Sequence, residues 1–455
     1  MIAMRLALMF LTPPLAAFVS ALRILRGSLL VLLLWPVVLT ANPNDAPAAD
    51  SAAAPDVLAV AEGESEGADA AETAAVTEPE KTWQPLKLLD AQVPVESKHT
   101  LRWSSLKSFA GLRTDVPVLV ANGHSEGPVL CIIAAIHGDE LNGIEMVRRV
   151  IEEVDPSALK GAVIGVPIVN LYGFQRGSRY LPDRRDLNRF FPGNADGSSA
   201  SRIARAFFDE IIRHCSAVVD IHTGSFHRTN LTQLRADLSN KDVVDLTKGF
   251  GGLSVLDDKG SLGTLRRAAT AAGIPSVTLE AGEPMRLQES HVKSGVRGIT
   301  SLMSHLGMID EARFWTAPQP VFYASTWVRS ERGGILLSVV PLGAQVAAGD
   351  VLGTVTDPVT NVRSEIVSTH SGRVLGMALN QVVMPGFAAY RIGIRRTEKE
   401  VSEQAEASAA EAEAEAAAAQ AAESQPDTPG KVRKRKKRPV QEEQVVPVDP
   451  DERPE

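Results

Sequence analysis

The stretch IIAAIHGDELNG (residues 132–143) places a histidine and a glutamate directly after an apolar run. Residues 127–138, GPVLCIIAAIHG, contain β-branched side chains and begin with glycine and proline, which is typical of a strand. The residues that follow repeat apolar side chains at helical spacing, namely Leu141, Ile144, Val147 and Ile151. We therefore expect His137 and Glu140 to lie in the turn between a buried strand and a helix.

Strand and helix signals continue to alternate beyond this turn. Strands are predicted over residues 116–123, 161–170, 217–224 and 274–283, and helices over residues 199–215 and 263–273. This alternation predicts an α/β fold with a mixed, mainly parallel sheet and helices on both faces. In such sheets, functional residues gather at the carboxyl ends of the strands. His137, His222 and Glu280 are all expected at such ends.

The sequence changes character after about residue 319. Residues 333–357 and 364–393 are rich in valine and glycine, lack a helical period and look like two related halves. They predict a small all-β domain over residues 319–397. Its spaced glycines resemble those of a biotinyl/lipoyl-like barrel, but no lysine between Val321 and Glu398 could serve as a carrier residue. We therefore expect a structural domain that caps the active-site side.

The N-terminal part of the chain predicts export. Residues 1–41 are strongly apolar with three arginines as their only charges, and they read as a signal peptide or a retained membrane anchor. Residues 42–85 are rich in small and acidic residues and predict a disordered linker. The remainder is expected in the periplasm, or tethered to the outer face of the cytoplasmic membrane.

Residues 398–455 predict a disordered tail, with an Ala/Glu-rich part that forms transient helix and then a basic segment. The basic segment KVRKRKKRP (residues 431–439) could contact acidic lipid headgroups or cell-wall polymer. The favoured alternative is a solvated tail with no partner. The net charge of −8 gives no argument for nucleic acid, and nucleic acid is not expected as a partner.

The chain has two cysteines, Cys131 in a predicted strand and Cys215 after a predicted helix. A count of two excludes a disulfide framework. Free cysteines often behave as small buried apolar side chains. We therefore expect two buried, unpaired thiols.

Three residues at predicted strand ends could hold a metal. Zinc in hydrolases takes three nitrogen or oxygen ligands from the protein and keeps one position open. His137 and Glu140 could supply two ligands from one turn, and His222 the third. Asp220 points to the same side of its strand as His222 and is a candidate outer partner. Alternatively, His137 is a surface histidine and Glu140 a charge favoured at a helix N-terminus.

The loop RYLPDRRDLNRFFPG (residues 179–193) contains several arginines. Arginine binds carboxylates through two parallel hydrogen bonds. Asn188 and Arg189, beside aromatic residues, could therefore cradle a carboxylate. A solvated charged loop is the other interpretation.

Glu280 ends a mostly apolar predicted strand, where an unpartnered glutamate is costly. Beside a metal, it could take a proton from water and pass it to a leaving nitrogen. An ion pair with an arginine is the alternative.

Four motifs in this order, HGDE, RRDLNRFFPG, DIHTG and TLEAGE, resemble the succinylglutamate desuccinylase/aspartoacylase family of the zinc carboxypeptidase-like superfamily. The resemblance implies a catalytic domain over residues 86–318. It implies a Zn²⁺ cofactor held by His137, Glu140 and His222, with Glu280 as general base and acid. It further implies that Asn188 and Arg189 grip a substrate carboxylate.

The resemblance also implies an arginine that stabilises the oxyanion of the scissile carbonyl. Arg179 is the first candidate and Arg184 the substitute, while Arg266 or Arg267 could be a further substrate arginine. The implied activity is a zinc amidohydrolase or deacylase acting on an N-acyl amino acid or a related small amide. The alternatives are a metallocarboxypeptidase acting on peptides, such as those of the cell wall, and a non-catalytic binding protein on the same fold.

Overall fold

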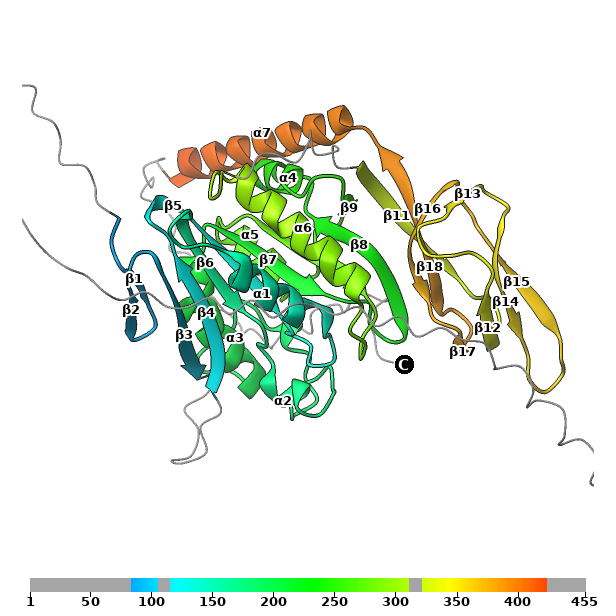
Figure 1. Cartoon of the computed structure of the whole chain (residues 1–455). Coiled ribbons are helices and arrows are strands. Elements are labelled where there is room, and N and C mark those ends of the chain that lie inside the picture. Colours follow the sequence, from blue (N-terminus) through cyan, green and yellow to red (C-terminus); the bar gives the residue numbers. More distant parts are fainter. Residues whose placement is uncertain (1–82, 105–114, 311–320, 424–455) are drawn as a thin grey trace, which may run out of the picture. The chain divides into compact units, whose positions relative to one another are not determined.

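The structure is a computed structural model that describes residues 83–104, 115–310 and 321–423 (Figure 1). The expected signal or anchor, nearly all of the expected linker and the basic segment lie outside these residues. Within the described part of the chain, no helix is both long enough and apolar enough to cross a membrane.

A 12-stranded mixed sheet forms the centre of the structure. Its strand order is β13-β16-β18-β11-β9-β8-β10-β7-β5-β6-β4-β3. The bounds are β3 (Ser97–Ser104), β4 (Asp115–Asn122), β5 (Ser125–Ala134), β6 (Lys160–Val166), β7 (Ala217–His222), β8 (Arg228–Ala236), β9 (Ser254–Asp257), β10 (Ser276–Gly282), β11 (Val321–Arg329), β13 (Gln345–Val346), β16 (Gly372–Ala378) and β18 (Ala388–Arg396). A separate hairpin of β1 (Leu86–Leu88) and β2 (Ala91–Val93) precedes it.

The α/β class and the mixed sheet agree with the sequence prediction. Parallel pairings run through β6-β5-β7-β10 and through β8-β9-β11. The remaining neighbours in this sheet pair antiparallel, including β10 with β8 and β11 with β18. A mainly parallel arrangement is therefore not confirmed for the sheet as a whole.

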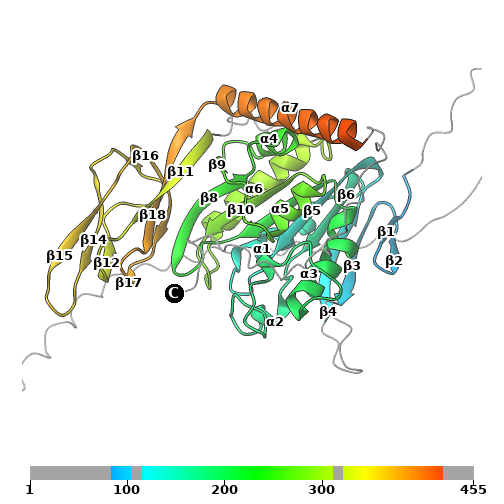
Figure 2. The same cartoon turned by 180° about the vertical axis from the view of Figure 1, so that it is seen from behind.

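Helices cover both faces of the sheet (Figures 1 and 2). Their bounds are α1 (Asn142–Glu153), α2 (Leu171–Phe174), α3 (Ser199–Glu210), α4 (Lys241–Lys248), α5 (Leu265–Ala271) and α6 (Glu289–His305), with 3-10 turns η1 (Leu187–Arg189) and η2 (Ile212–His214). Because alternate residues of a strand face opposite sides, Ile132 of β5 packs in a core with α1, α4 and α6. Its neighbour Ile133 packs in a second core with α3 and α5.

The prediction of two unpaired thiols is wrong, because Cys131 and Cys215 form a disulfide. Cys131 lies within β5, and Cys215 lies just before the neighbouring parallel strand β7. Their Cα atoms are 5.7 Å apart, inside the range that a disulfide spans. Sequence alone did not show that these two segments are neighbours, so the pairing could not be foreseen.

The C-terminal β region extends the central sheet. β11 pairs with β9, and β16 pairs with β8, so strands beyond residue 320 continue the sheet of the preceding region. A second, four-stranded sheet packs with them around a core that contains Tyr390 and Leu336. This sheet consists of β15 (Arg363–Val367), β14 (Val351–Thr356), β12 (Gly334–Ser338) and β17 (Gln381–Val383).

Residues 398–423, expected as part of a disordered tail, form helix α7 (Glu398–Glu423). Thr397 and Glu400 make a reciprocal capping box: Thr397 N donates to Glu400 Oε2 at 2.7 Å, and Glu400 N donates to Thr397 Oγ1 at 3.2 Å. Val401 and Ala405 are buried in the core that also contains α4 residues, and Figure 1 shows α7 alongside α4. Packing and a cap therefore stabilise a segment whose alanines and glutamates favour helix intrinsically.

Candidate active site

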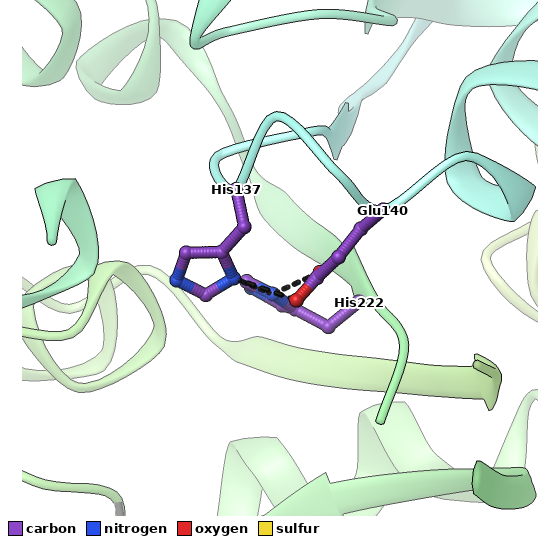
Figure 3. A group of neighbouring side chains, drawn as sticks. All are labelled: His137, Glu140 and His222. Carbon is purple, nitrogen blue, oxygen red and sulfur yellow. Dashed lines mark hydrogen bonds and ion pairs between the residues drawn. The ribbon is translucent and has the colours of Figure 1, made fainter. Parts of the chain in front are cut away.

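His137, Glu140 and His222 converge at the carboxyl end of the central strands (Figure 3). His137 and Glu140 lie in the turn after β5, and His222 is the last residue of the adjacent β7. One ligand atom from each residue lies within 4.8 Å of the other two. Nδ1 of His137 is 2.8 Å from Glu140 Oε1, and Nδ1 of His222 is 2.9 Å from Glu140 Oε2. All three side chains are buried.

The turn that carries the first two side chains requires glycine at position 138. A Cβ atom there would lie 2.1 Å from backbone atoms of Gly173 and Phe174 in α2. The α2 backbone therefore packs directly on the bare Gly138. Asn170 caps α2 by accepting a hydrogen bond from Gly173 N at 2.9 Å. This packing fixes the His137–Glu140 turn against a neighbouring helix.

Each histidine has a carboxylate on its second ring nitrogen. Asp186 Oδ1 lies 3.0 Å from Nε2 of His137, and Asp220 Oδ2 lies 2.9 Å from Nε2 of His222. Such outer carboxylates orient metal-binding histidines and raise their basicity. Asp220 was a candidate for this role in the sequence, whereas Asp186 was not recognised as one.

The electrostatics of the cluster favour the charged forms of both His222 and Asp186. Burial lowers the pKa of His222, but Asp220 and Glu140 outweigh it and raise that pKa well above its usual value. Burial raises the pKa of Asp186, but Arg179 and His137 outweigh it and hold that pKa well below its usual range. Two imidazoles and one carboxylate, each partnered in this way, form a donor set that fits Zn²⁺.

Arg179 is buried beside the three candidate ligands. Its Nη1 lies 3.3 Å from Glu140 Oε1, its Nη2 donates to Asp186 Oδ2 at 3.0 Å, and its guanidinium stacks 5.4 Å from the Phe226 ring centre. Among the described residues, its buried Nε has no hydrogen-bond partner. Arg184, the substitute candidate, is exposed and does not line the cavity described below.

Asn188 and Arg189 lie in η1, next to His222. Asn188 Nδ2 is 3.4 Å from His222 Nε2, and Asn188 Oδ1 accepts from Leu265 N at 2.8 Å. Nη1 of Arg189 donates to the carbonyl of Asn188 at 2.9 Å. Both side chains line the same cavity as the three candidate ligands. They are therefore placed to contact a ligand there.

Glu280 faces this cavity from β10, in register with His222 on β7. Its Oε2 accepts a hydrogen bond from Asn230 Nδ2 at 2.9 Å, and its Oε1 lies 3.2 Å from Nε of Arg235. Glu280 therefore forms the ion pair with an arginine that was the alternative interpretation, and it also faces the cavity. An ion pair and a role as general base do not exclude each other.

A cavity of about 490 Å³ unites these residues. Seven arginines line it: Arg179, Arg189, Arg228, Arg235, Arg266, Arg329 and Arg391. The lining contains three carboxylates, Glu140, Asp258 and Glu280, so arginines exceed carboxylates by four. Arg266 therefore lies in the cavity, whereas Arg267 lies outside it and donates to the carbonyl of Gly260.

The C-terminal β region contributes part of the cavity wall. Trp327 and Arg329 of β11 and Arg391 of β18 line it. Arg228 and Arg391 lie 5.4 and 5.6 Å from the Trp327 ring centre, within cation–π distance. Sequence reasoning expected a cap over this side but named none of these residues, because no motif marks them.

Residues 126–306 match a known protein family, described as the succinylglutamate desuccinylase/aspartoacylase catalytic domain. A curated relative, the N-alpha-acetyl-L-2,4-diaminobutyric acid deacetylase of Halomonas elongata, is 29% identical over 259 residues, which are 53% of this chain and 74% of that protein.

Solved structures share the fold. A succinylglutamate desuccinylase/aspartoacylase from Rhodobacter sphaeroides is 22% identical with a TM-score of 0.59, and the match covers 66% of this chain and 96% of that chain. The product-bound ectoine utilization protein EutE (DoeB) from Ruegeria pomeroyi has the same identity and TM-score, with 66% and 97% covered. At this identity the likeness concerns the fold.

Proposed function

Because the chain belongs to the succinylglutamate desuccinylase/aspartoacylase family, we propose that it is a zinc-dependent amidohydrolase that removes the acyl group from an N-acyl amino acid. The observation that carries the proposal is the convergence of His137, Glu140 and His222 beside Glu280 in one cavity. Three nitrogen and oxygen donors with a nearby carboxylate base are the components of a catalytic zinc site.

The residues around the donor set have separate tasks in this proposal. Zinc, when bound, supplies a Lewis acid that polarises a carbonyl and acidifies a water molecule. Glu280 accepts a proton from the attacking water and returns it to the leaving nitrogen. Arg179, which lines the cavity beside the candidate ligands, donates to the developing oxyanion.

The cavity favours an acidic substrate. Arginines are the most frequent charged residues of its lining and favour anions, and Asn188 with Arg189 is placed to bind one carboxylate. The Halomonas elongata relative is named for a substrate whose product carries a second amino group. The free side-chain ammonium group of such a substrate would meet repulsion here, so we propose that the preferred substrate of this chain carries a further carboxylate instead.

A substrate panel tests the proposal. Zinc-loaded protein is incubated with N-acetyl and N-succinyl derivatives of aspartate and glutamate, with N-alpha-acetyl-2,4-diaminobutyrate and with short acidic peptides, and the released amine is quantified. We expect the acidic N-acyl amino acids to give the highest kcat/KM. Preferred cleavage of peptides would replace the proposal with a metallocarboxypeptidase, and binding without turnover of any compound would favour a non-catalytic protein.

We further propose that the protein works outside the cytoplasm. The support is the arginine-flanked apolar segment within residues 1–41. The disulfide between Cys131 and Cys215 agrees with this proposal, since stable disulfides are typical of oxidising compartments.

A further inference from the structure

Both carboxylate oxygens of Glu280 are engaged by residues of one strand, β8. Asn230 Nδ2 donates a hydrogen bond to Oε2 at 2.9 Å, and Arg235 Nε forms an ion pair with Oε1 at 3.2 Å that lacks hydrogen-bond geometry. The Glu280 side chain is only 7% exposed and that of Arg235 only 17%. A buried carboxylate is stable when such partners replace its lost water. One carboxylate oxygen is thus held by a hydrogen bond and the other by an ion pair.

Arg235 is in turn held by Asp258, which follows β9. Nη1 of Arg235 lies 4.0 Å from Asp258 Oδ2. Two further arginines contact the same carboxylate, Arg266 Nη2 at 3.3 Å and Arg391 Nη2 at 3.7 Å. Burial raises the pKa of Asp258, but the three arginines outweigh it and hold that pKa far below its usual range. Asp258 is therefore ionised, and it lies within ion-pair distance of all three arginines.

The C-terminal β region contacts both of these supports. Arg391 belongs to β18, so the region supplies one of the three arginines on Asp258. β16 pairs with β8 so that Gly376 lies opposite Asn230. A Cβ atom on Gly376 would be 2.5 Å from Asn230 Oδ1, so the amide packs against bare backbone. Two independent contacts thus link this region to the partners of Glu280.

We propose that the C-terminal β region orients the general base: Asn230 and Arg235 are positioning residues for Glu280, and Arg391, through Asp258, is a positioning residue for Arg235. This inference rests on the proposed function, because it takes Glu280 as the base. A base must lie at a defined place relative to the reacting water, and a displacement of about 1 Å costs roughly 100-fold in rate. The β region then acts on the chemical step as well as on the shape of the cavity.

The competing explanation is that Arg235 and Arg391 bind anionic groups of the substrate. The two explanations differ in kinetics. Loss of an interaction that is equal in the ground and transition states raises KM, whereas loss of orientation at the reacting centre lowers kcat.

The test uses the full chain loaded with zinc and the best substrate of the panel. Arg235→Gln is expected to lower kcat about 10- to 100-fold with KM unchanged. Arg235→Lys, which keeps the buried charge, is expected to recover part of the loss. Arg391→Gln should lower kcat about 2- to 30-fold, the range for residues that act through others. Free guanidinium should partly rescue Arg235→Ala.

Arg396→Gln is the matched control. Arg396 also lies on β18 and pairs with the residue next to Asp258: its Nη1 is 3.0 Å from Asp257 Oδ2. It does not line the cavity. The variant breaks an ion pair between β18 and the end of β9, as Arg391→Gln does, but it removes no contact to Arg235 or Glu280. Its kcat and KM are expected to equal those of the unmodified protein.

The outcomes separate this inference from the proposed function. If Glu280→Gln is inactive while Arg235→Gln and Arg391→Gln keep their kcat or only raise KM, the positioning role is overturned and the proposed function stands. If Glu280→Gln retains the full rate, the proposed function and this inference both fail. If Arg235→Gln does not fold, Arg235→Lys decides: a lower kcat at constant KM supports positioning, and an unchanged kcat overturns it.

Discussion

Breaking the disulfide between Cys131 and Cys215 is expected to destabilise the fold by about 2–4 kcal/mol. The two cysteines are 84 residues apart in the chain. Closing a loop of that length in the unfolded chain corresponds to an entropic stabilisation of about 4.6 kcal/mol at 25 °C, and the typical stabilisation by a disulfide is about 2–4 kcal/mol. Domains are typically stable by about 5–15 kcal/mol, so the loss would be a large fraction of the total. Because β5 and β7 also carry the residues that lead to His137 and His222, zinc binding should weaken as the fold loosens.

Urea unfolding at equilibrium, followed by circular dichroism, measures the effect. The protein is compared before and after reduction, and with a variant that combines Cys131→Ser and Cys215→Ser. The reduced protein and the double variant should both unfold at lower urea than the oxidised protein. Mass spectrometry provides the control by counting free thiols. Two free thiols in protein purified without reductant, or the same midpoint with and without reductant, would refute the reasoning.

Three further predictions follow from the site and the ends of the chain. Glu280→Gln should keep its zinc and its fold while kcat, measured by amine release, falls about 10²- to 10⁴-fold. A fully active variant would mean that another residue is the general base, and Glu283 would be tested next. Asp186→Asn, which removes the charge of the carboxylate beside Nε2 of His137, should weaken zinc affinity about 10- to 100-fold in competition with a chelator, and unchanged affinity would rule out that supporting role. Residues 1–85 fused to a reporter that works only outside the cytoplasm should give an active reporter, whereas a stable but silent fusion would count against export.

The class of fold was predictable because it depends on local patterns. β-branched runs alternate with amphipathic segments, and this determines an α/β architecture before any contact is known. The same reasoning located His137, His222 and Glu280 at strand ends, and the structure brings all three to one cavity. β5, β7 and β10 are parallel neighbours, so their carboxyl ends lie at the same edge of the sheet. Residues predicted at those ends were therefore also predicted to lie close together.

Contacts between distant segments could not be read in this way. Asp186 follows no periodic pattern, and its role appears only when its loop reaches the ring of His137. Arg235 sits inside a strand like any polar residue, and only the antiparallel pairing of β8 with β10 brings it to Glu280. The ordered helix α7 was not predicted because its Ala/Glu-rich composition resembles that of low-complexity sequence. Its first turn is anchored by Val401, whose burial in the core is a contact between distant segments.

The central claim is that His137, Glu140 and His222 hold a catalytic zinc ion, and the metal content of the purified protein tests it most directly. The full chain, purified without chelator and analysed by inductively coupled plasma mass spectrometry, should contain about one zinc ion per chain. His137→Ala and His222→Ala should lose it, and His124→Ala, which changes an exposed histidine outside the cavity, should retain it. Full zinc occupancy in both of the first two variants, or a folded unmodified protein that takes up no zinc, would contradict the account.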